Sequence, residues 1–171
     1  MSQGSQLAVY AGSFDPLTIG HLWMVEQGVA LFPKLVVAIG INPDKRYTFT
    51  VEERLAMLRS SVGHLAGIEF GSFTQQFLIT YAKSIGATHI LRGIRSESDY
   101  EYERVMRNIN GDLCADITTV FLMPPRDIAE VSSSMVKGLI GPAGWQRVVK
   151  PYVPKPVFKS LVERFHGRAA K

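Results

Sequence analysis

The residues best suited to phosphate chemistry begin just after the first apolar segment of the chain. Gly12 and Gly20 bracket a loop, and His21 follows at the expected start of a helix. A helix amino terminus offers free amides and the positive end of the helix dipole, which favour a phosphate. His21 can donate a hydrogen bond to a phosphoryl oxygen there, while Ser13 offers a hydroxyl and an amide. A plain turn with a chance histidine is the alternative, because short motifs produce false positives.

A second group with affinity for phosphate is the segment Arg92-Gly93-Ile94-Arg95, after the fourth apolar segment. The planar fork of arginine binds phosphate with two parallel hydrogen bonds, and two such forks flanking an accessible amide suit a triphosphate. The alternative is a corner of ion pairs with the acidic residues that follow, namely Asp99, Glu101 and Glu103. Glu103 itself could pair with Arg107 four residues on, or turn inward toward a ribose or an arginine.

Two further loops carry residues of the same kind. Lys45 follows the second apolar segment, where it either reaches into a crevice or stays a solvated surface charge. Ser132, Ser133 and Ser134 precede an expected helix, either as a second anion site or as a simple helix cap. Four such loops together favour a binding site for phosphorylated ligands. Lys45, Arg92 and Arg95 would place part of the chain's positive charge there.

The segments that must position these loops alternate between strand-like and helix-like patterns. Helices are expected at Gly20–Leu31, after a capping box formed by Thr50 and Glu53, at Gln75–Ser84, at Ser98–Ile109, from Ser132 to Ile140 and at Val157–Phe165. Strands are expected at Leu7–Ala11, Leu35–Ile41, Ile68–Phe73, His89–Leu91 and Thr118–Met123. This alternation predicts an α/β fold, a doubly wound five-stranded parallel sheet of Rossmann-like type with helices on both faces. Ligands then bind at the carboxyl ends of the strands, where all four loops lie.

The chain is expected to form a single domain over residues 1–171, because 171 residues suffice for one hydrophobic core. Four prolines between positions 142 and 156 mark residues 141–171 as a proline-containing tail with a short terminal helix. In the helix Ser98–Ile109, Tyr102 falls on an apolar stripe with Val105, Met106 and Ile109, which predicts that Tyr102 lies in the core.

Composition excludes several classes of protein. Cys114 is the one cysteine, so neither an internal disulfide nor a cysteine-based zinc site can form. The four histidines show no ligand spacing, and we expect no protein-held metal. A net charge of +4 without basic runs favours a small anionic ligand over nucleic acid. No signal peptide and no apolar run of membrane-spanning length is seen, so we expect a cytoplasmic protein without membrane contact.

Several of these segments resemble a known family. The stretch Gly12–Pro16 with Thr18-Ile19-Gly20-His21 resembles the T-x-G-H signature of the nucleotidyltransferase superfamily. The Arg92–Arg95 segment, followed by the stretch Asp99–Glu103, is more specific and resembles the bacterial phosphopantetheine adenylyltransferases. The resemblance extends from about Leu7 to Lys137.

The resemblance implies transfer of the adenylyl group of ATP to 4′-phosphopantetheine, giving dephospho-CoA and pyrophosphate in coenzyme A biosynthesis. It implies Mg²⁺ bound with ATP, a homo-oligomer, usually a hexamer, and feedback inhibition by coenzyme A. The implied catalytic residues are His21, Lys45 and Arg95. The implied phosphopantetheine-binding residues are Ser13, Lys45, Leu78 and Arg92. The implied ATP-binding residues are Ser13, Phe14, His21, Gly93, Ile94, Arg95, Glu103, Ile128, Ala129, Glu130, Val131, Ser132, Ser133 and Ser134.

Two other functions stay open at this point. The same chemistry could serve another phosphorylated acceptor, such as nicotinamide mononucleotide, although the run Asp99–Glu103 argues against it. A non-catalytic nucleotide-binding module is the second alternative, which would be expected to have lost His21, Lys45 or Arg92.

Overall fold

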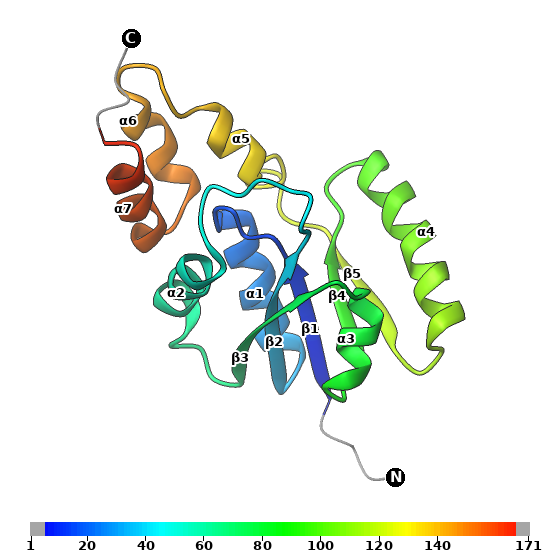
Figure 1. The fold of residues 1–171 in the computed structure, drawn as a ribbon. Helices are drawn as coiled ribbons and strands as arrows, with labels where there is room; N and C mark the ends of the chain where they lie inside the picture. Colours follow the sequence, from blue (N-terminus) through cyan, green and yellow to red (C-terminus); the bar gives the residue numbers. More distant parts are fainter. Residues whose placement is uncertain (1–5, 167–171) are drawn as a thin grey trace.

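The computed structural model describes residues 6–166, and its centre is a sheet of five parallel strands in the order β3-β2-β1-β4-β5 (Figure 1). Every neighbouring pair runs parallel, so each connection is a crossover that carries a helix or a helix-containing segment. The predicted α/β class and the doubly wound sheet are therefore confirmed. The strands are β1 Leu7–Gly12, β2 Lys34–Ile41, β3 Ile68–Thr74, β4 His89–Gly93 and β5 Thr118–Leu122.

Helices cover both faces of the sheet. Successive residues of β1 point to opposite faces, and their apolar side chains pack against helices on each face. Ala8 and Tyr10 belong to the core cluster that includes residues of α1, α2 and α7, whereas Val9 and Ala11 belong to the cluster that includes residues of α3. The helices are α1 Ile19–Leu31, α2 Val51–Val62, α3 Leu78–Ser84, α4 Glu97–Leu113, α5 Ser133–Gly138, α6 Trp145–Val149 and α7 Lys155–Arg164, with a 3₁₀ turn at Lys150–Tyr152 between the last two.

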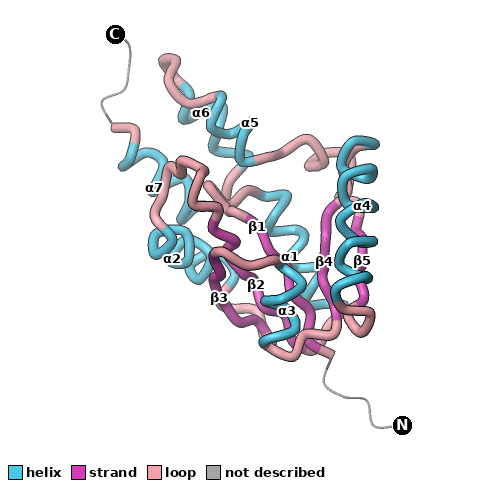
Figure 2. The backbone as a smooth tube through the Cα atoms, turned by 45° about the vertical axis from the view of Figure 1, so that its right-hand side comes forward, coloured by secondary structure: helices cyan, strands magenta, loops and turns pink. Residues whose placement is uncertain are grey.

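The strand order reverses beside β1, which pairs with β2 on one side and with β4 on the other. The connections that leave β1 and β4 therefore diverge, and a crevice opens between them at the carboxyl ends of these strands. In Figure 1 the arrow of β1 points toward the region where α5 lies, and the chain leaving β4 turns there before α4 runs back along the sheet. Figure 2 shows α4 alongside β4 and β5 at the same edge.

The start of α2 confirms the predicted capping box. Glu53 donates its backbone N–H to Thr50 Oγ1 at 3.2 Å, and Thr50 donates its own N–H to Glu53 Oε2 at 2.7 Å. Two backbone donors that the helix cannot satisfy internally are thereby satisfied.

Several element boundaries differ from the prediction: α4 continues to Leu113 rather than ending at Ile109, and α6 was not predicted. Three other differences have local reasons. Helix α3 begins at Leu78 rather than Gln75, because Gln75 has a φ of +53°, outside the helical region. Strand β4 continues through Arg92 and Gly93. Helix α7 begins at Lys155 because Pro156 lies in its first turn, where a missing N–H costs nothing.

The expectation that Tyr102 lies in the core is wrong. Its side chain is 60% exposed, and Val105 and Ile109 are exposed with it. Among the residues of α4, all of which the structure describes, Glu103 is the buried one. Because the helix turns its carboxylate toward the sheet, the apolar stripe beside it faces outward.

None of the helices within residues 6–166 is long and apolar enough to cross a membrane.

We predict that Thr50→Ala lowers the free energy of unfolding by about 1 kcal/mol, because the Glu53 amide loses its acceptor. In a chain of this size the loss corresponds to a fall in Tm of roughly 2–4 °C. Ser60→Ala is the matched control, since Ser60 is an exposed hydroxyl residue inside the same helix. Thermal unfolding followed by circular dichroism measures both variants, and equal Tm values for the two would contradict the capping role.

Candidate active site

A cleft of about 430 Å³ lies where the connections after β1, β4 and β5 meet. The end of β1 and the start of α1 form one wall, and the end of β4 with the first turns of α4 forms another. The segment between β5 and α5 closes the third side. The lining residues are Tyr10, Ala11, Gly12, Ser13, Gly20, His21, Met24, Arg92, Gly93, Arg95, Asp99, Tyr102, Glu103, Pro124, Ile128, Val131, Ser132, Ser133 and Ser134.

The orientation of His21 is set by a capping box at the start of α1. Thr18 donates its backbone N–H to His21 Nδ1 at 3.0 Å, and Thr18 Oγ1 lies 2.8 Å from the same nitrogen. A backbone amide can only donate, so Nδ1 is an acceptor and the neutral ring carries its proton on Nε2. Nε2 is therefore the nitrogen free to donate a hydrogen bond to a ligand.

The protonation state of His21 follows from its surroundings. Burial, and secondarily the positive charge of Arg95, lowers the pKa of His21 from 6.5 to about 4. Both causes disfavour a second positive charge in the cleft, so the imidazole is neutral at pH 7. His21 is thereby suited to donate a hydrogen bond rather than to transfer a proton.

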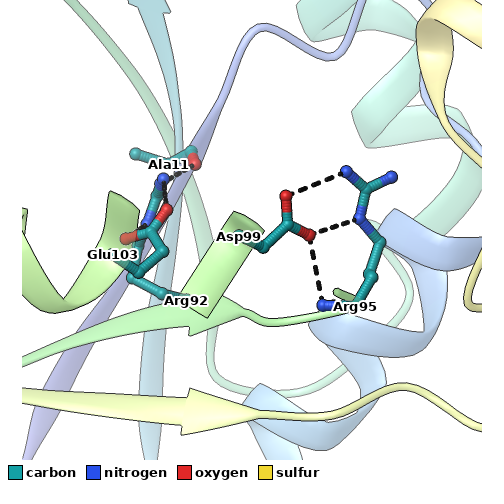
Figure 3. Close-up of polar contacts among 5 residues, drawn as sticks. All are labelled: Ala11, Arg92, Arg95, Asp99 and Glu103. Carbon is teal, nitrogen blue, oxygen red and sulfur yellow. Dashed lines mark hydrogen bonds and ion pairs between the residues drawn. The ribbon is translucent and has the colours of Figure 1, made fainter. Parts of the chain in front are cut away.

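The guanidinium of Arg92 is held in one orientation by Glu103 and by a carbonyl at the end of β1 (Figure 3). Its Nε donates to Glu103 Oε2 at 2.9 Å, its Nη2 bonds to Glu103 Oε1, and its Nη1 donates to the Ala11 carbonyl at 3.2 Å. Burial alone would lower the pKa of Arg92, but the hydrogen bond and charge of Glu103 raise it above the usual value. The inward alternative for Glu103 is confirmed, with an arginine as its partner.

Arg95 has its own carboxylate partner, four residues further on (Figure 3). Asp99 Oδ2 accepts from Arg95 Nε at 3.0 Å and from the Arg95 backbone N–H at 3.1 Å. Both arginines of the cleft are thus charge-compensated by α4. The alternative of ion pairs with Asp99 and Glu103 is therefore confirmed, and two carboxylates balance the positive charge that the arginines bring to this edge.

The third wall closes directly onto the first loop. Ser133 Oγ donates to the Pro16 carbonyl at 2.8 Å, while Ser132 Oγ caps α5 by accepting from the Met135 amide at 3.1 Å. A Cβ at Gly20 would lie 3.1 Å from the Val131 carbonyl oxygen. Glycine at position 20 is therefore what lets these two segments approach each other without displacement.

A buried carboxylate joins the loops below the cleft. Asp15, 1% exposed, accepts from the backbone amides of Thr48 at 2.9 Å and Phe49 at 3.0 Å, and from Lys137 Nζ at 3.1 Å. These partners come from the connection between β2 and α2 and from α5. Asp15 therefore links the loop after β1 and helix α5, which both line the cleft, to the connection after β2, which does not.

The structure brings most of the predicted site residues together and leaves some outside. Phe14 and Ile94 are buried behind the wall, and Ala129 and Glu130 do not line the cleft. Lys45 is exposed, with its Nζ 5.9 Å from the centre of the Tyr47 ring. The predicted residues that line the cleft are Ser13, His21, Arg92, Gly93, Arg95, Glu103, Ile128, Val131, Ser132, Ser133 and Ser134.

Leu78 lies in a second cavity of about 410 Å³ beside the first. Phe73, Phe77, Met106 and Ile109 give this cavity an apolar lining. Ala11, Gly12, Arg92, Tyr102 and Glu103 line both cavities. The ion pair of Arg92 with Glu103 therefore stands between a polar cleft and an apolar one.

Sequence reasoning missed several residues of the site. Tyr10, Met24 and Pro124 line the cleft from segments read only as strand, helix or turn. Burial raises the pKa of the Tyr10 hydroxyl, so Tyr10 stays neutral. Tyr102, predicted to lie in the core, is instead largely exposed and lines both cavities. Their residue types carry no phosphate signal, and only the tertiary contacts reveal them.

Within residues 6–166, no three side chains of His, Cys, Asp or Glu gather closely enough to hold a metal ion.

Comparison with known proteins gives a consistent result. A family model described as cytidylyltransferase-like matches residues 9–139. The chain is 57% identical over 158 residues to the phosphopantetheine adenylyltransferase of Chromobacterium violaceum, covering 92% of this chain and 96% of that protein. It is 58% identical over 160 residues to the phosphopantetheine adenylyltransferase of Neisseria meningitidis, covering 93% and 94%.

Two solved structures share the fold at low sequence identity. Nicotinic acid mononucleotide adenylyltransferase of Plasmodium falciparum, complexed with NaAD, has a TM-score of 0.67 at 16% identity, covering 95% of this chain and 97% of that one. TmcAL of Thermotoga maritima, bound with alpha-thio ATP, has a TM-score of 0.68 at 13% identity, covering 96% of this chain and 57% of that one.

We predict that the His21 ring titrates with a midpoint of about 4 in NMR spectra recorded between pH 3.5 and 8. The variant His21→Gln identifies its resonance. Arg95→Met should move the midpoint upward, because it removes a nearby positive charge while the larger effect of burial stays. A midpoint near the ordinary value of 6.5, or no response to Arg95→Met, would contradict the electrostatic description of the cleft.

Proposed function

The chain belongs to the cytidylyltransferase-like family and, within it, to the phosphopantetheine adenylyltransferases, and from this premise we propose how its cleft performs the transfer. The reaction joins the adenylyl group of ATP to 4′-phosphopantetheine in coenzyme A biosynthesis. An oxygen of the acceptor phosphate attacks the α-phosphorus of ATP, a new P–O bond forms, and the bond to the leaving pyrophosphate breaks.

This chemistry matches what the cleft contains. The attacking phosphate is already an anion, so the protein needs no general base. It must align two phosphates and stabilise the charge that develops on the α-phosphate. His21 is neutral, its Nδ1 is engaged by Thr18, and its Nε2–H is free to donate to that phosphate. The orientation of His21 is the observation that carries the proposal.

We assign ATP to the cleft between α1, α4 and the segment that precedes α5. The amino end of α1 lines it at Gly20, and both amides and dipole there favour a phosphate. Arg95, 40% exposed in its side chain, can exchange Asp99 for phosphate oxygens, which supports a role in binding the triphosphate and in catalysis. Ser13 and Ser132–Ser134 supply hydroxyls and amides around the same space.

We assign phosphopantetheine to the boundary of the two cavities. Arg92 lines both, so its fork can face the acceptor phosphate while the apolar cavity around Leu78 receives the pantetheine arm. Glu103 keeps the Arg92 fork oriented. Lys45 completes the proposed set, as a cation that approaches the acceptor phosphate from the connection between β2 and α2.

The proposed metal ion, compartment, inhibitor and oligomeric state rest mainly on what membership of the family implies. Mg²⁺ binds with ATP, because it prefers phosphate oxygens and water as ligands, and it supplies positive charge to the triphosphate. The protein acts in the cytoplasm, and coenzyme A inhibits it by occupying both cavities. It assembles as a homo-oligomer, a hexamer by resemblance; the exposed apolar stripe of Tyr102, Val105 and Ile109 on α4 supports a contact between copies.

Pyrophosphate release from ATP with a panel of acceptors tests the function. We expect turnover with 4′-phosphopantetheine and none with pantetheine, which is the matched control because it lacks the attacking phosphate. Nicotinamide mononucleotide is the third acceptor. Turnover with that acceptor but not with phosphopantetheine would overturn the assignment of substrate, and ATP binding without any turnover would indicate a non-catalytic module.

We predict that His21→Ala lowers kcat by about 100-fold or more while ATP affinity changes little, because its hydrogen bond strengthens in the transition state. Steady-state kinetics and calorimetric titration with ATP measure the two effects. His64→Ala, at an exposed histidine beyond the end of α2, is the control and should keep full kcat. An unchanged kcat in His21→Ala would remove His21 from the mechanism.

A further inference from the structure

Arg54 in α2 is the largest fully buried side chain within residues 6–166, with 1% of its surface exposed. No carboxylate within residues 6–166 lies within ion-pair distance of its guanidinium. The charge of Arg54 acts on the exposed Glu52, but no carboxylate in the described part of the chain contacts the guanidinium directly, so its hydrogen bonds and ring contact must hold it there. Arg54 belongs to no ligand-binding set assigned above.

The contacts of Arg54 lead to the first loop of the cleft. Its Nη1 donates to the Ser13 carbonyl at 2.8 Å, and its Nε donates to the Thr50 carbonyl at 3.2 Å. Ser13 lines the cleft, and its loop is fixed separately by Asp15. The guanidinium is therefore anchored to the part of the site that carries the first phosphate-binding residues.

A further contact of the Arg54 guanidinium, with the Tyr47 ring, leads to the loop that carries Lys45. The guanidinium carbon lies 4.1 Å from the centre of the Tyr47 ring, a cation–π distance. The Tyr47 hydroxyl accepts from the Asn42 amide at 2.9 Å, just past the end of β2, and Lys45 Nζ lies 5.9 Å from the same ring. Arg54 and Lys45 thus share the Tyr47 ring as a neighbour.

Within residues 6–166, the backbone hydrogen bonds at the tip of this loop are short-range. Lys45 donates its backbone N–H to the Asn42 carbonyl at 3.1 Å, and Asp44 donates its own to Asn42 Oδ1 at 2.9 Å. The far end of the loop is fixed by Asp15, through the amides of Thr48 and Phe49. The contacts of Tyr47 with Arg54 and Asn42 therefore decide where the tip stands relative to the cleft.

We propose that Arg54 is a positioning residue for Lys45: anchored on the Ser13 carbonyl, its guanidinium holds the Tyr47 ring and thereby places the loop that presents Lys45 to the substrates. This inference rests on the proposed function, in which Lys45 approaches the acceptor phosphate, and on the catalytic role that the family resemblance implies for Lys45. Arg54 itself does not touch substrate, because it is buried.

A double-mutant cycle on kcat tests the coupling, since it isolates the interaction from general destabilisation. Arg54→Met keeps the side-chain length and removes the hydrogen bonds and the charge. We expect it to lower kcat about 10-fold or more with KM for ATP changed by less than about threefold, because a misplaced catalytic group loses transition-state stabilisation. In a Lys45→Ala background, the same substitution should lower kcat by less than about twofold.

Tyr47→Leu repeats the test with less risk to folding, because Tyr47 is only half-buried. It should show the same loss of kcat, again only when Lys45 is present, and it decides the test if Arg54→Met does not fold. Arg59→Met is the matched control: Arg59 lies in the same helix with its guanidinium over the Phe70 ring at 5.6 Å, and its loss should leave kcat unchanged.

The outcomes separate the inference from the function on which it rests. A wild-type protein that forms no dephospho-CoA overturns the proposed function and the inference together. An active wild type whose Arg54→Met and Tyr47→Leu variants keep full kcat, or lose it equally with and without Lys45, overturns the positioning role alone. Loss of kcat that disappears in the Lys45→Ala background confirms it.

Discussion

The cleft depends on the buried carboxylate of Asp15. A parallel sheet brings the carboxyl ends of its strands to one edge, but it does not by itself hold the loops that leave them. Asp15 accepts from two backbone amides of the connection after β2 and from Lys137 of α5, while it belongs to the loop after β1. Because leaving this charge unsatisfied in the interior would be costly, the three segments are held in one arrangement. Arg54, bonded to the Ser13 carbonyl, extends the same anchor toward Lys45.

Carboxylates of α4 organise the electrostatics of the site. Arg92 and Arg95 are each oriented by a carboxylate of α4, Glu103 and Asp99 respectively. An arginine fork that is already oriented loses less entropy when it meets a phosphate than a free side chain does. His21 is kept neutral by burial and by the positive charge of Arg95, so it can donate a hydrogen bond without adding a full charge. The cleft is therefore suited to hydrogen-bond the charge that develops on a phosphate.

The fold and the chemistry are separable in this protein. Two solved structures with 16% and 13% identity share the architecture, and such similarity concerns the fold alone. The chemistry of this chain lies in its loops and in α4, where Asp99 lines the polar cleft and Met106 lines the apolar cavity. The ion pair of Arg92 with Glu103 stands at the boundary of the two. A substrate with a phosphate at one end and an uncharged arm at the other suits that boundary.

The sequence by itself determined the α/β class, the five strands, the capping box at Thr50 and the loops that carry Ser13, His21, Arg92 and Arg95, because periodicity and cap chemistry are local. It could not decide which carboxylates pair with the arginines, or that Tyr102 faces outward. Nor could it show that Arg54 is buried, since an arginine in a helix is usually a surface charge. These features depend on how elements pack, since Arg92 meets Glu103 only where α4 lies against β4, and Arg54 meets the carbonyl of Ser13, 41 positions away. Periodicity indicates which side of its own element a residue occupies, whereas only the tertiary structure decides what lies opposite.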